Sequence, residues 1–226
     1  MHSSPDVSPN RNLSWNTLQP REIRWRTLGQ KPVIAWLTGL SGSGKSSIAN
    51  AVDRKLTQAG RTTMVLDGDN LRHGLNRDLG FTASDRIENI RRTAETAKLM
   101  AEAGVVTIVS LISPFREERA AARAIAGDIT FLEVFVNTSL DICEARDPKG
   151  LYERARAGTI PHFTGVSAPY EVPSEPDLVL TTEGRGVAAS AQPLINTLMQ
   201  FSTSPGSQIK RVRTERVGRS RSELRC

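Results

Sequence analysis

Residues 39–46 of this chain form a pattern that could bind the phosphates of a nucleotide. They read GLSGSGKS and fit GxxxxGK[ST], between an apolar run at 33–38 and a helix-like run at 47–58. Glycines let successive backbone N–H groups turn toward an anion, and the N-terminus of the following helix adds partial positive charge. In this pattern Lys45 reaches the β- and γ-phosphates, and the Ser46 hydroxyl is a ligand of Mg²⁺. A chance glycine-serine loop is the alternative, which the flanking patterns disfavour. The residues expected to bind a nucleoside triphosphate are Gly39, Leu40, Ser41, Gly42, Ser43, Gly44, Lys45 and Ser46.

Two carboxylates follow the next apolar run of the chain. Asp67 and Asp69 are separated by one glycine in the segment DGDNLRHGLN. Ligands of open α/β sheets bind beyond the carboxyl ends of the strands, so this pair is expected near the phosphate-binding loop. One carboxylate linked to Mg²⁺ and one acting as a base for a hydroxyl nucleophile would suit phosphoryl transfer. The alternative is an acidic turn with solvated carboxylates.

Cationic and aromatic side chains lie close to this segment in the sequence. Arg72 and Arg86 could neutralise an anionic phosphoryl acceptor, and Phe81 could stack on a flat ring. An anionic nucleotide would use both kinds of group.

A further candidate is Ser113, in the segment ISPFREER that follows the apolar run at 105–111. Three roles stay open for it: a substrate contact, a hydroxyl that is phosphorylated, or the N-cap of the next helix. The residue types favour the cap, with Pro114 at the start of that helix.

Residues 147–176 are rich in glycine, proline and charge, and predict a long irregular stretch within a compact domain. Loops of this length are usually functional lids or linkers. Arginine and lysine next to glycine, as in RDPKGLY at 146–152, suit a lid that brings charge to bound phosphates and excludes water. A solvated basic loop is the alternative. We expect a mobile lid at about 147–166.

The elements that must position these groups alternate regularly along the chain. Strands are expected at 33–38, 62–67, 105–111, 131–136 and 177–182, and helices at 45–59, 84–103, 115–126, 139–146 and 186–200. The strands are nearly continuous apolar runs, as expected when helices cover both faces of a parallel sheet. The prediction is a three-layer α/β/α fold of the P-loop NTPase class, with a mainly parallel five-stranded sheet.

Charge is distributed unevenly over the 226 residues. The net charge is +6, but residues 208–226 hold seven basic and two acidic residues, which leaves the rest nearly neutral. We expect an N-terminal extension at 1–30, partly docked or disordered, with Trp15 and Trp25 as docking anchors. The catalytic domain is expected at 31–202 and a disordered arginine-rich tail at 203–226.

Several classes of protein are disfavoured by composition. No apolar run approaches the roughly 20 residues of a membrane-spanning helix, and the N-terminus does not resemble a signal peptide. The two cysteines, Cys143 and Cys226, make no disulfide framework, so a reducing cytoplasm is the expected compartment. We expect neither nucleic acid nor membrane as a partner.

Together, GLSGSGKS, DGDNLRHGLNRDLGF, ISPFREER, EARDPKGLYERARAG and HFTG resemble the adenylylsulfate kinase (APS kinase) family. The resemblance runs in order over about four-fifths of the chain, from Trp15 to Leu198. It implies transfer of the γ-phosphoryl group of ATP, with Mg²⁺, to the 3′-hydroxyl of adenosine 5′-phosphosulfate (APS). The product would be PAPS, the activated sulfate donor. The resemblance also implies a homodimer and a functional link to an ATP sulfurylase.

The resemblance assigns roles to individual positions. Asp69 would orient or deprotonate the 3′-hydroxyl, Ser113 matches a serine described in the family as a phosphoserine intermediate, and Lys45 completes the catalytic set. Direct in-line transfer needs no such covalent step. Phe81 and Phe163 would sandwich the acceptor adenine. The residues implied to contact the acceptor are Asp69, Arg72, Phe81, Arg86, Asn89, Ile112, Ser113, Lys149 and Phe163.

Other functions remain as alternatives. A P-loop kinase for another small hydroxyl acceptor would share the phosphate-binding loop but would not need the DGDNLRHGLN segment with Phe81. A non-catalytic nucleotide-dependent module could use the arginine-rich tail on RNA, and salt-sensitive RNA binding would favour it. The chain could also correspond to the kinase half of a sulfurylase–kinase fusion, although it contains no recognisable sulfurylase segment.

Overall fold

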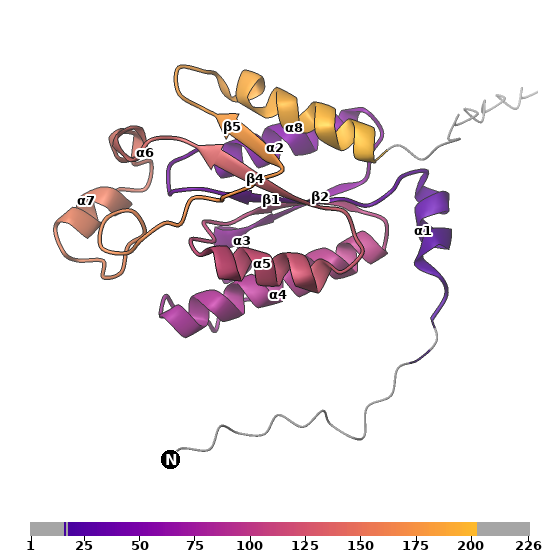
Figure 1. The fold of residues 1–226 in the computed structure, drawn as a ribbon, viewed down its shortest axis with the longest axis horizontal. Helices are drawn as coiled ribbons and strands as arrows, with labels where there is room; N and C mark the ends of the chain where they lie inside the picture. Colours follow the sequence, from indigo (N-terminus) through magenta and orange to yellow (C-terminus); the bar gives the residue numbers. More distant parts are fainter. Residues whose placement is uncertain (1–15, 17, 203–226) are drawn as a thin grey trace, which may run out of the picture.

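The computed structural model describes residue 16 and residues 18–202. The arginine-rich tail, Cys226 and Trp15 lie outside this part, so the predictions made for them stay predictions. Five strands form one sheet in the order β2-β3-β1-β4-β5, and every neighbouring pair is parallel (Figure 1). The strands are β1 (Ile34–Thr38), β2 (Thr63–Asp67), β3 (Val106–Ser110), β4 (Phe131–Asn137) and β5 (Leu178–Thr181). The predicted sheet is confirmed.

Helices cover both faces of this sheet. The helices are α1 (Arg21–Leu28), α2 (Lys45–Gln58), α3 (Gly68–Arg72), α4 (Ala83–Glu102), α5 (Arg116–Ala126), α6 (Leu140–Arg146), α7 (Leu151–Arg156) and α8 (Val187–Phe201). Figure 1 shows α2 and α8 on one face and α4 and α5 on the other. The five helices expected from sequence are therefore present, whereas α1, α3 and α7 were not predicted.

The start of α4 is fixed by local chemistry. Thr82 is the N-cap: its hydroxyl accepts from the backbone N–H of Asp85, and the Asp85 carboxylate accepts from the N–H of Thr82. This reciprocal pair satisfies two N–H groups that would otherwise lack partners. The pair fixes the point at which α4 begins, directly after the segment that contains Asp69 and Phe81.

The connections after the adjacent strands β1 and β3 leave on opposite faces of the sheet. β1 leads into α2 on one face, and β3 leads into α5 on the other. A crevice forms at the carboxyl end of the sheet wherever connections diverge in this way. The phosphate-binding loop and the Ile112–Ser113 segment are the two connections that meet there, joined by the N–H of Gly39, which donates to the carbonyl of Ile112 at 3.5 Å.

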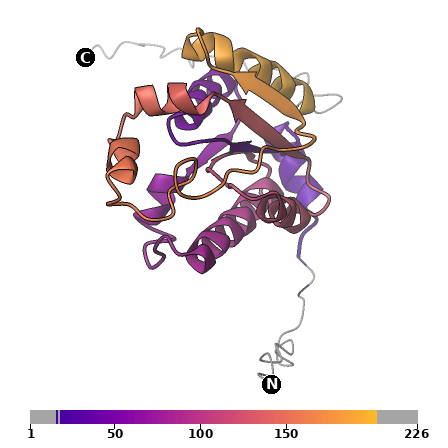
Figure 2. The same ribbon diagram turned by 60° about the vertical axis from the view of Figure 1, so that its left-hand side comes forward.

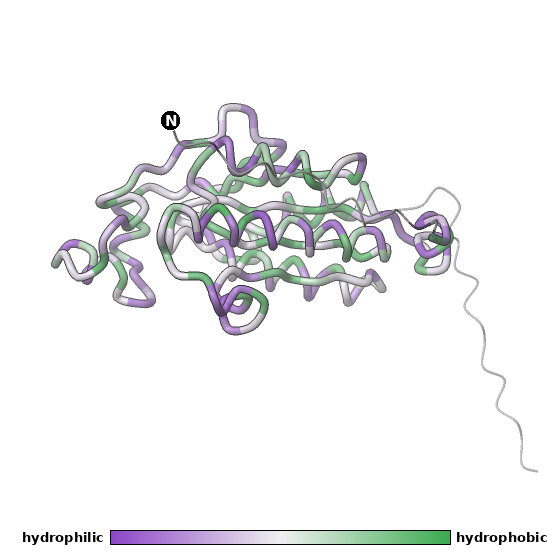
Figure 3. Tube along the Cα trace, turned by 90° about the horizontal axis from the view of Figure 1, so that it is seen from below, coloured by the Kyte–Doolittle hydropathy of each residue, from purple (hydrophilic) through white to green (hydrophobic). Residues whose placement is uncertain are grey.

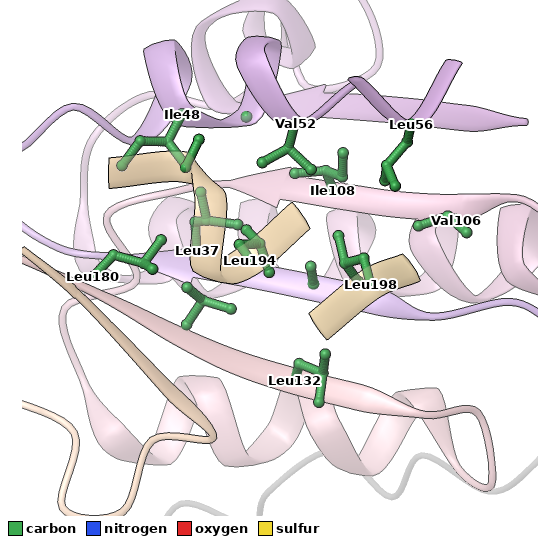
Figure 4. Packing of buried hydrophobic residues seen from close by; sticks show 14 of the residues in the cluster. Leu37, Ile48, Val52, Leu56, Val106, Ile108, Leu132, Leu180, Leu194 and Leu198 are labelled. Carbon is green, nitrogen blue, oxygen red and sulfur yellow. The ribbon is translucent and has the colours of Figure 1, made fainter. Parts of the chain in front are cut away.

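Two apolar clusters stabilise the layers. One lies between the sheet and α2 with α8, and includes Leu37, Val52 and Leu194 (Figure 4). The other lies between the sheet and α4 with α5 around Trp36. Figure 3 shows the helices alternating between hydrophobic and hydrophilic residues, as expected for helices that pack on one side only. No helix within the described residues is long and apolar enough to cross a membrane.

The segment before β1 packs against the body of the molecule. The Trp25 indole N–H donates to the carbonyl of Ala101 at 3.2 Å, so Trp25 is a docking anchor as predicted. The Gln30 amide, fully buried, donates to the carbonyls of Thr62 and Gly104. Helix α1 lies at the end of the sheet opposite α6 and α7 (Figure 1), away from the phosphate-binding loop.

Replacement of Leu194 by alanine should lower the free energy of unfolding by roughly 2–5 kcal/mol, because it leaves a cavity in a fully buried cluster. Leu99→Ala is the matched control, since Leu99 is 66% exposed on the outer face of α4 and its loss should change stability by no more than about 0.5 kcal/mol. Urea unfolding of both variants measures the difference, and equal losses would contradict this packing.

Candidate active site

The phosphate-binding loop fits closely against the chain that follows β4. Gly42 has φ +74°, and a Cβ at this position would lie 2.8 Å from the carbonyl oxygen of Cys143. Gly44, the residue before α2, has φ +102°. These backbone angles strain any residue with a side chain, so glycine is required here by conformation and, at Gly42, also by space.

Lys45 is the first residue of α2 and is turned back into the loop. Its ammonium donates to the carbonyls of Gly39 at 2.9 Å and Leu40 at 2.7 Å, and it is 8% exposed. Burial lowers the pKa of the amine from 10.5 to about 8. Lys45 therefore bonds to the loop itself and its charge is poorly solvated, which favours an anionic partner.

Ser46 forms an oxygen-rich site with the end of β2. Its hydroxyl donates to Asp67 at 2.7 Å and lies 3.3 Å from the Ser110 hydroxyl. These hard oxygen donors fit Mg²⁺, which typically takes one or two protein oxygens together with water and substrate phosphates. In the described part of the chain, no group of three or more His, Cys, Asp or Glu side chains could hold a metal by itself. Any Mg²⁺ bound here would share its coordination with the nucleotide.

Asp67 and Asp69 have different surroundings. Asp67 is the N-cap of α3, where it accepts from the N–H of Asp69 at 3.1 Å while also accepting from Ser46. The Asp69 side chain, in contrast, is 63% exposed and forms an ion pair with Lys149. One carboxylate is thus joined to the phosphate-binding loop, and the other faces the lid segment and remains accessible.

Arg72 and Phe81 form one unit. The Arg72 guanidinium carbon lies 4.4 Å from the centre of the Phe81 ring, and the side chain donates to the carbonyls of Leu79 and Gly80. Burial, followed by the nearby charge of Arg86, lowers the pKa of Arg72. Phe81 is 69% exposed, so its ring is open to a ligand.

Arg86 connects the start of α4 to the lid segment. Its guanidinium donates to the carbonyls of Phe81 at 3.1 Å and His162 at 2.9 Å, and to the Thr164 hydroxyl at 3.2 Å. The two residues on either side of Phe163 are therefore held beside Phe81. Asn89, one turn further along α4, is 5% exposed and bonds through its amide to Asn76.

Ser113 is not the cap of the following helix, so that prediction is wrong. Helix α5 begins at Arg116 with Phe115 as its N-cap, and Pro114 therefore precedes the helix rather than opening it. Ser113 has φ +43° and is 2% exposed, and its hydroxyl accepts from the Trp36 indole at 3.0 Å. Its neighbour Ile112 accepts from the Thr38 hydroxyl at 2.6 Å.

The lid segment contains a short helix that the sequence analysis described as irregular. Asp147 accepts from the backbone N–H groups of Leu151, Tyr152 and Glu153 at the start of α7. The Tyr152 hydroxyl donates to the carbonyl of Ser41 at 2.9 Å, which ties α7 to the phosphate-binding loop. Figure 2 shows the chain after α7 returning across this end of the sheet toward β5.

Phe163 is packed inside the lid segment. It is 8% exposed and makes an edge contact with Tyr152, with ring centres 5.0 Å apart. Of the two rings expected to sandwich an adenine, Phe81 is open and Phe163 is covered. A signal for the missed α7 was Asp147 shortly before LYERAR, since its carboxylate accepts from the first N–H groups of that helix.

The structure brings most predicted site residues together through direct contacts. The phosphate-binding loop reaches Asp67 through Ser46, Asp69 reaches the lid through Lys149, and Arg86 joins Phe81 to the lid. Asn76 and Tyr152 were not singled out from sequence, although both fall within the segments DGDNLRHGLN and RDPKGLY. Their roles depend on contacts with distant parts of the chain.

Known proteins match this chain over most of its length. The family model described as adenylylsulphate kinase matches residues 31–181. The adenylyl-sulfate kinase of Clostridium kluyveri is 50% identical over 191 residues, which are 84% of this chain and 94% of that protein. The Mycobacterium tuberculosis APS kinase CysC, solved in complex with AMPPNP and APS, is 53% identical with a TM-score of 0.73, over 75% of this chain and 98% of that one.

A third relative is much longer than this chain. The bifunctional enzyme NodQ of Rhizobium tropici is 58% identical over 181 residues, which are 80% of this chain but 29% of NodQ. This chain therefore spans less than a third of that relative.

The affinity for ATP should fall as the pH rises through about 8, where the Lys45 amine of the free protein loses its proton. The amine is mostly charged at about pH 7 and mostly neutral at about pH 9, and the neutral form attracts phosphates less. Calorimetric titration with ATP across this range measures the effect. Lys45→Met should bind ATP more weakly and lose most of the dependence on pH; the same dependence in both proteins would contradict the assignment.

Proposed function

This chain belongs to the adenylylsulfate kinase family, and we propose that it transfers the γ-phosphoryl group of ATP to the 3′-hydroxyl of APS, giving ADP and PAPS. The arrangement of Asp69 and Asp67 supports the proposal most directly. The exposed carboxylate of Asp69 lies between the phosphate-binding loop and the lid, paired with Lys149, while Asp67 next to it is bonded to Ser46. A loop suited to bind donor phosphates and an exposed carboxylate suited to act as the base therefore adjoin each other, as transfer to a hydroxyl requires.

On the donor side, the protein's task is alignment and neutralisation of charge. The loop N–H groups and the Lys45 ammonium would bind the β- and γ-phosphates, with Lys45 exchanging its bonds to Gly39 and Leu40 for phosphate oxygens. Ser46 and Asp67 would hold Mg²⁺, which supplies charge neutralisation at the phosphates when bound. The buried ammonium loses little solvation on meeting the phosphates, because burial has already removed it from water.

On the acceptor side, Asp69 would orient the 3′-hydroxyl and receive its proton. Lys149 would leave its ion pair with Asp69 as the acceptor enters, and would then approach the phosphates. Arg72, Arg86 and Asn89 would bind the phosphosulfate and ribose. Little base strength is needed, because the transition state of phosphoryl transfer is loose and the proton moves late.

The acceptor adenine would stack on Phe81, which is open, and on Phe163 after the lid has moved. Phe163 is packed against Tyr152, so a sandwich requires the 147–166 segment to shift. The bonds from Arg86 to His162 and Thr164 would guide that movement. This is the role we propose for a mobile lid.

Ser113 would support the site rather than carry a phosphoryl group. Its hydroxyl is buried and occupied by the Trp36 indole, and direct transfer from ATP needs no covalent intermediate. Together with Ile112 it would form the wall of the acceptor site next to the phosphate-binding loop.

We further propose a cytoplasmic homodimer that works with an ATP sulfurylase, the class of enzyme that supplies APS. NodQ, named a bifunctional enzyme, extends well beyond the 29% of its length that this chain matches, which supports a link to a second activity. Within the described residues, Cys143 is a free and buried thiol, which suits a reducing compartment.

An ADP-release assay with MgATP should show rapid turnover with APS and none with AMP, adenosine or gluconate. Asp69→Asn should lower turnover by about 100-fold or more, the usual contribution of a positioned base. Asp128→Asn is the matched control, because Asp128 is a surface carboxylate paired with Arg21, the first residue of α1; it should keep full activity. Turnover with another acceptor but not with APS would refute the proposal.

Phe81→Ala should weaken the binding of APS far more than the binding of ATP, because loss of one base–aromatic stack typically costs ~1–3 kcal/mol. The KM values for APS and for ATP measure the two effects separately. Phe201→Ala is the control, since Phe201 is a half-exposed ring at the end of α8. Equal increases in both KM values would argue against stacking of the acceptor on Phe81.

A further inference from the structure

Asn76 lies in the turn between α3 and α4 and is fully buried, at 0% exposure. Its backbone is fixed at both polar groups. The N–H donates to the carbonyl of Leu71 at 2.8 Å, and the carbonyl accepts from the N–H of Leu79 at 3.1 Å. The position of the residue is therefore set by the turn, and its side chain is left to make other contacts.

The Asn76 side chain meets the side chain of Asn89. Nδ2 of Asn76 donates to Oδ1 of Asn89 at 3.0 Å. The backbone carbonyl of Asn89 separately accepts from the Thr93 hydroxyl at 2.7 Å. Oδ1 of Asn76 is buried and has no hydrogen-bond partner among the described residues.

This contact determines which end of the Asn89 amide is available. A side-chain amide has an accepting oxygen and a donating nitrogen at opposite ends. With Oδ1 engaged by Asn76, Asn89 offers its Nδ2 hydrogens, which bind oxygen atoms and anions. The unpaired oxygen of Asn76 costs stability, so a contribution to stability alone explains the pair poorly.

We propose that Asn76 is a positioning residue for the acceptor: it holds the Asn89 amide so that Nδ2 donates to an oxygen of the APS phosphosulfate or ribose. The inference rests on the proposed function, in which Asn89 contacts the acceptor. Asn76 is wholly buried, so it acts through Asn89 and not on the ligand.

The turn that holds Asn76 also holds Arg72. The Arg72 guanidinium donates to the carbonyls of Leu79 and Gly80, and the N–H of Leu79 donates to the carbonyl of Asn76. Two groups on the acceptor side thus depend on the 73–80 turn. The Asn76 side chain, however, bonds directly to the amide of Asn89, which allows its effect to be separated from that of the turn.

A double-mutant cycle tests the inference. Steady-state kinetics of wild type, Asn76→Ala, Asn89→Ala and the double variant give kcat and the KM for APS and for ATP. Each single variant should raise the KM for APS about tenfold, the usual effect of losing one hydrogen bond to a charged group, and leave the KM for ATP unchanged. The double variant should be no worse than Asn89→Ala, because a residue that acts through another is not additive with it.

Asn76→Asp provides a readout that a structural role would not give. Its protonated carboxyl can donate to Oδ1 of Asn89 as the amide does, whereas the ionised form can only accept and would reverse the Asn89 amide. The KM for APS, relative to wild type, should therefore rise with pH in this variant. Thr93→Val is the matched control, because it removes a bond to the Asn89 backbone and spares the amide; it should leave the KM for APS unchanged.

Two results would overturn the inference: additive effects in the cycle, or a KM for APS in Asn76→Asp that equals wild type at every pH. If Asn76→Ala fails to fold, Asn76→Ser replaces it in the cycle. A wild-type protein inactive toward APS would refute the proposed function and the inference with it. An active wild type with an additive cycle would refute the inference alone.

Discussion

The divergence of the chain after β1 and β3 is the constraint on which the site depends. These adjacent parallel strands send their connections to opposite faces of the sheet, so the two connections separate at its carboxyl end. The Thr38 hydroxyl joins them, since it donates to the carbonyl of Ile112 and contacts the Tyr170 hydroxyl at 2.9 Å. The site lies at this join because the backbone topology leaves it open there.

The lid segment is attached to the phosphate-binding loop and to α4 by bonds of different chemistry. The Tyr152 hydroxyl donates to the carbonyl of Ser41 in the phosphate-binding loop, and Arg86 donates to residues 162 and 164. The first bond lies on the proposed donor side and the second contact on the proposed acceptor side. Movement of the lid segment would therefore change the contacts of both substrates. Transfer of a phosphoryl group with water excluded requires such a link.

The two lysines of the site already have partners within the protein, which the substrates would replace. Lys45 bonds to loop carbonyls, and Lys149 bonds to Asp69. Each ammonium lies where it could bond to phosphate oxygens in place of its present partner. Burial lowers the pKa of the Lys45 amine to about 8. The ammonium of Lys45 is hydrogen-bonded to neutral carbonyls, so an anion can still pair with its charge.

Sequence alone determined the elements and most of the chemistry. Periodicity and glycine punctuation located the five strands and five of the helices (α2, α4, α5, α6 and α8), because these depend on local propensity and burial. The GxxxxGK[ST] pattern and the spacing of Asp67 and Asp69 predict a phosphate-binding loop with two carboxylates near it, because this chemistry is set by residue type and short-range spacing.

Only the tertiary structure decided how these groups are paired. The burial of Ser113 against Trp36, the bond from Asn76 to Asn89 and the covering of Phe163 by Tyr152 join residues of different elements. For that reason the cap assigned to Ser113 was wrong: a strained backbone at φ +43° is held by contacts with β1, which local sequence does not encode. Residue types fix what a group can do, and the packing of distant segments fixes which partner it has.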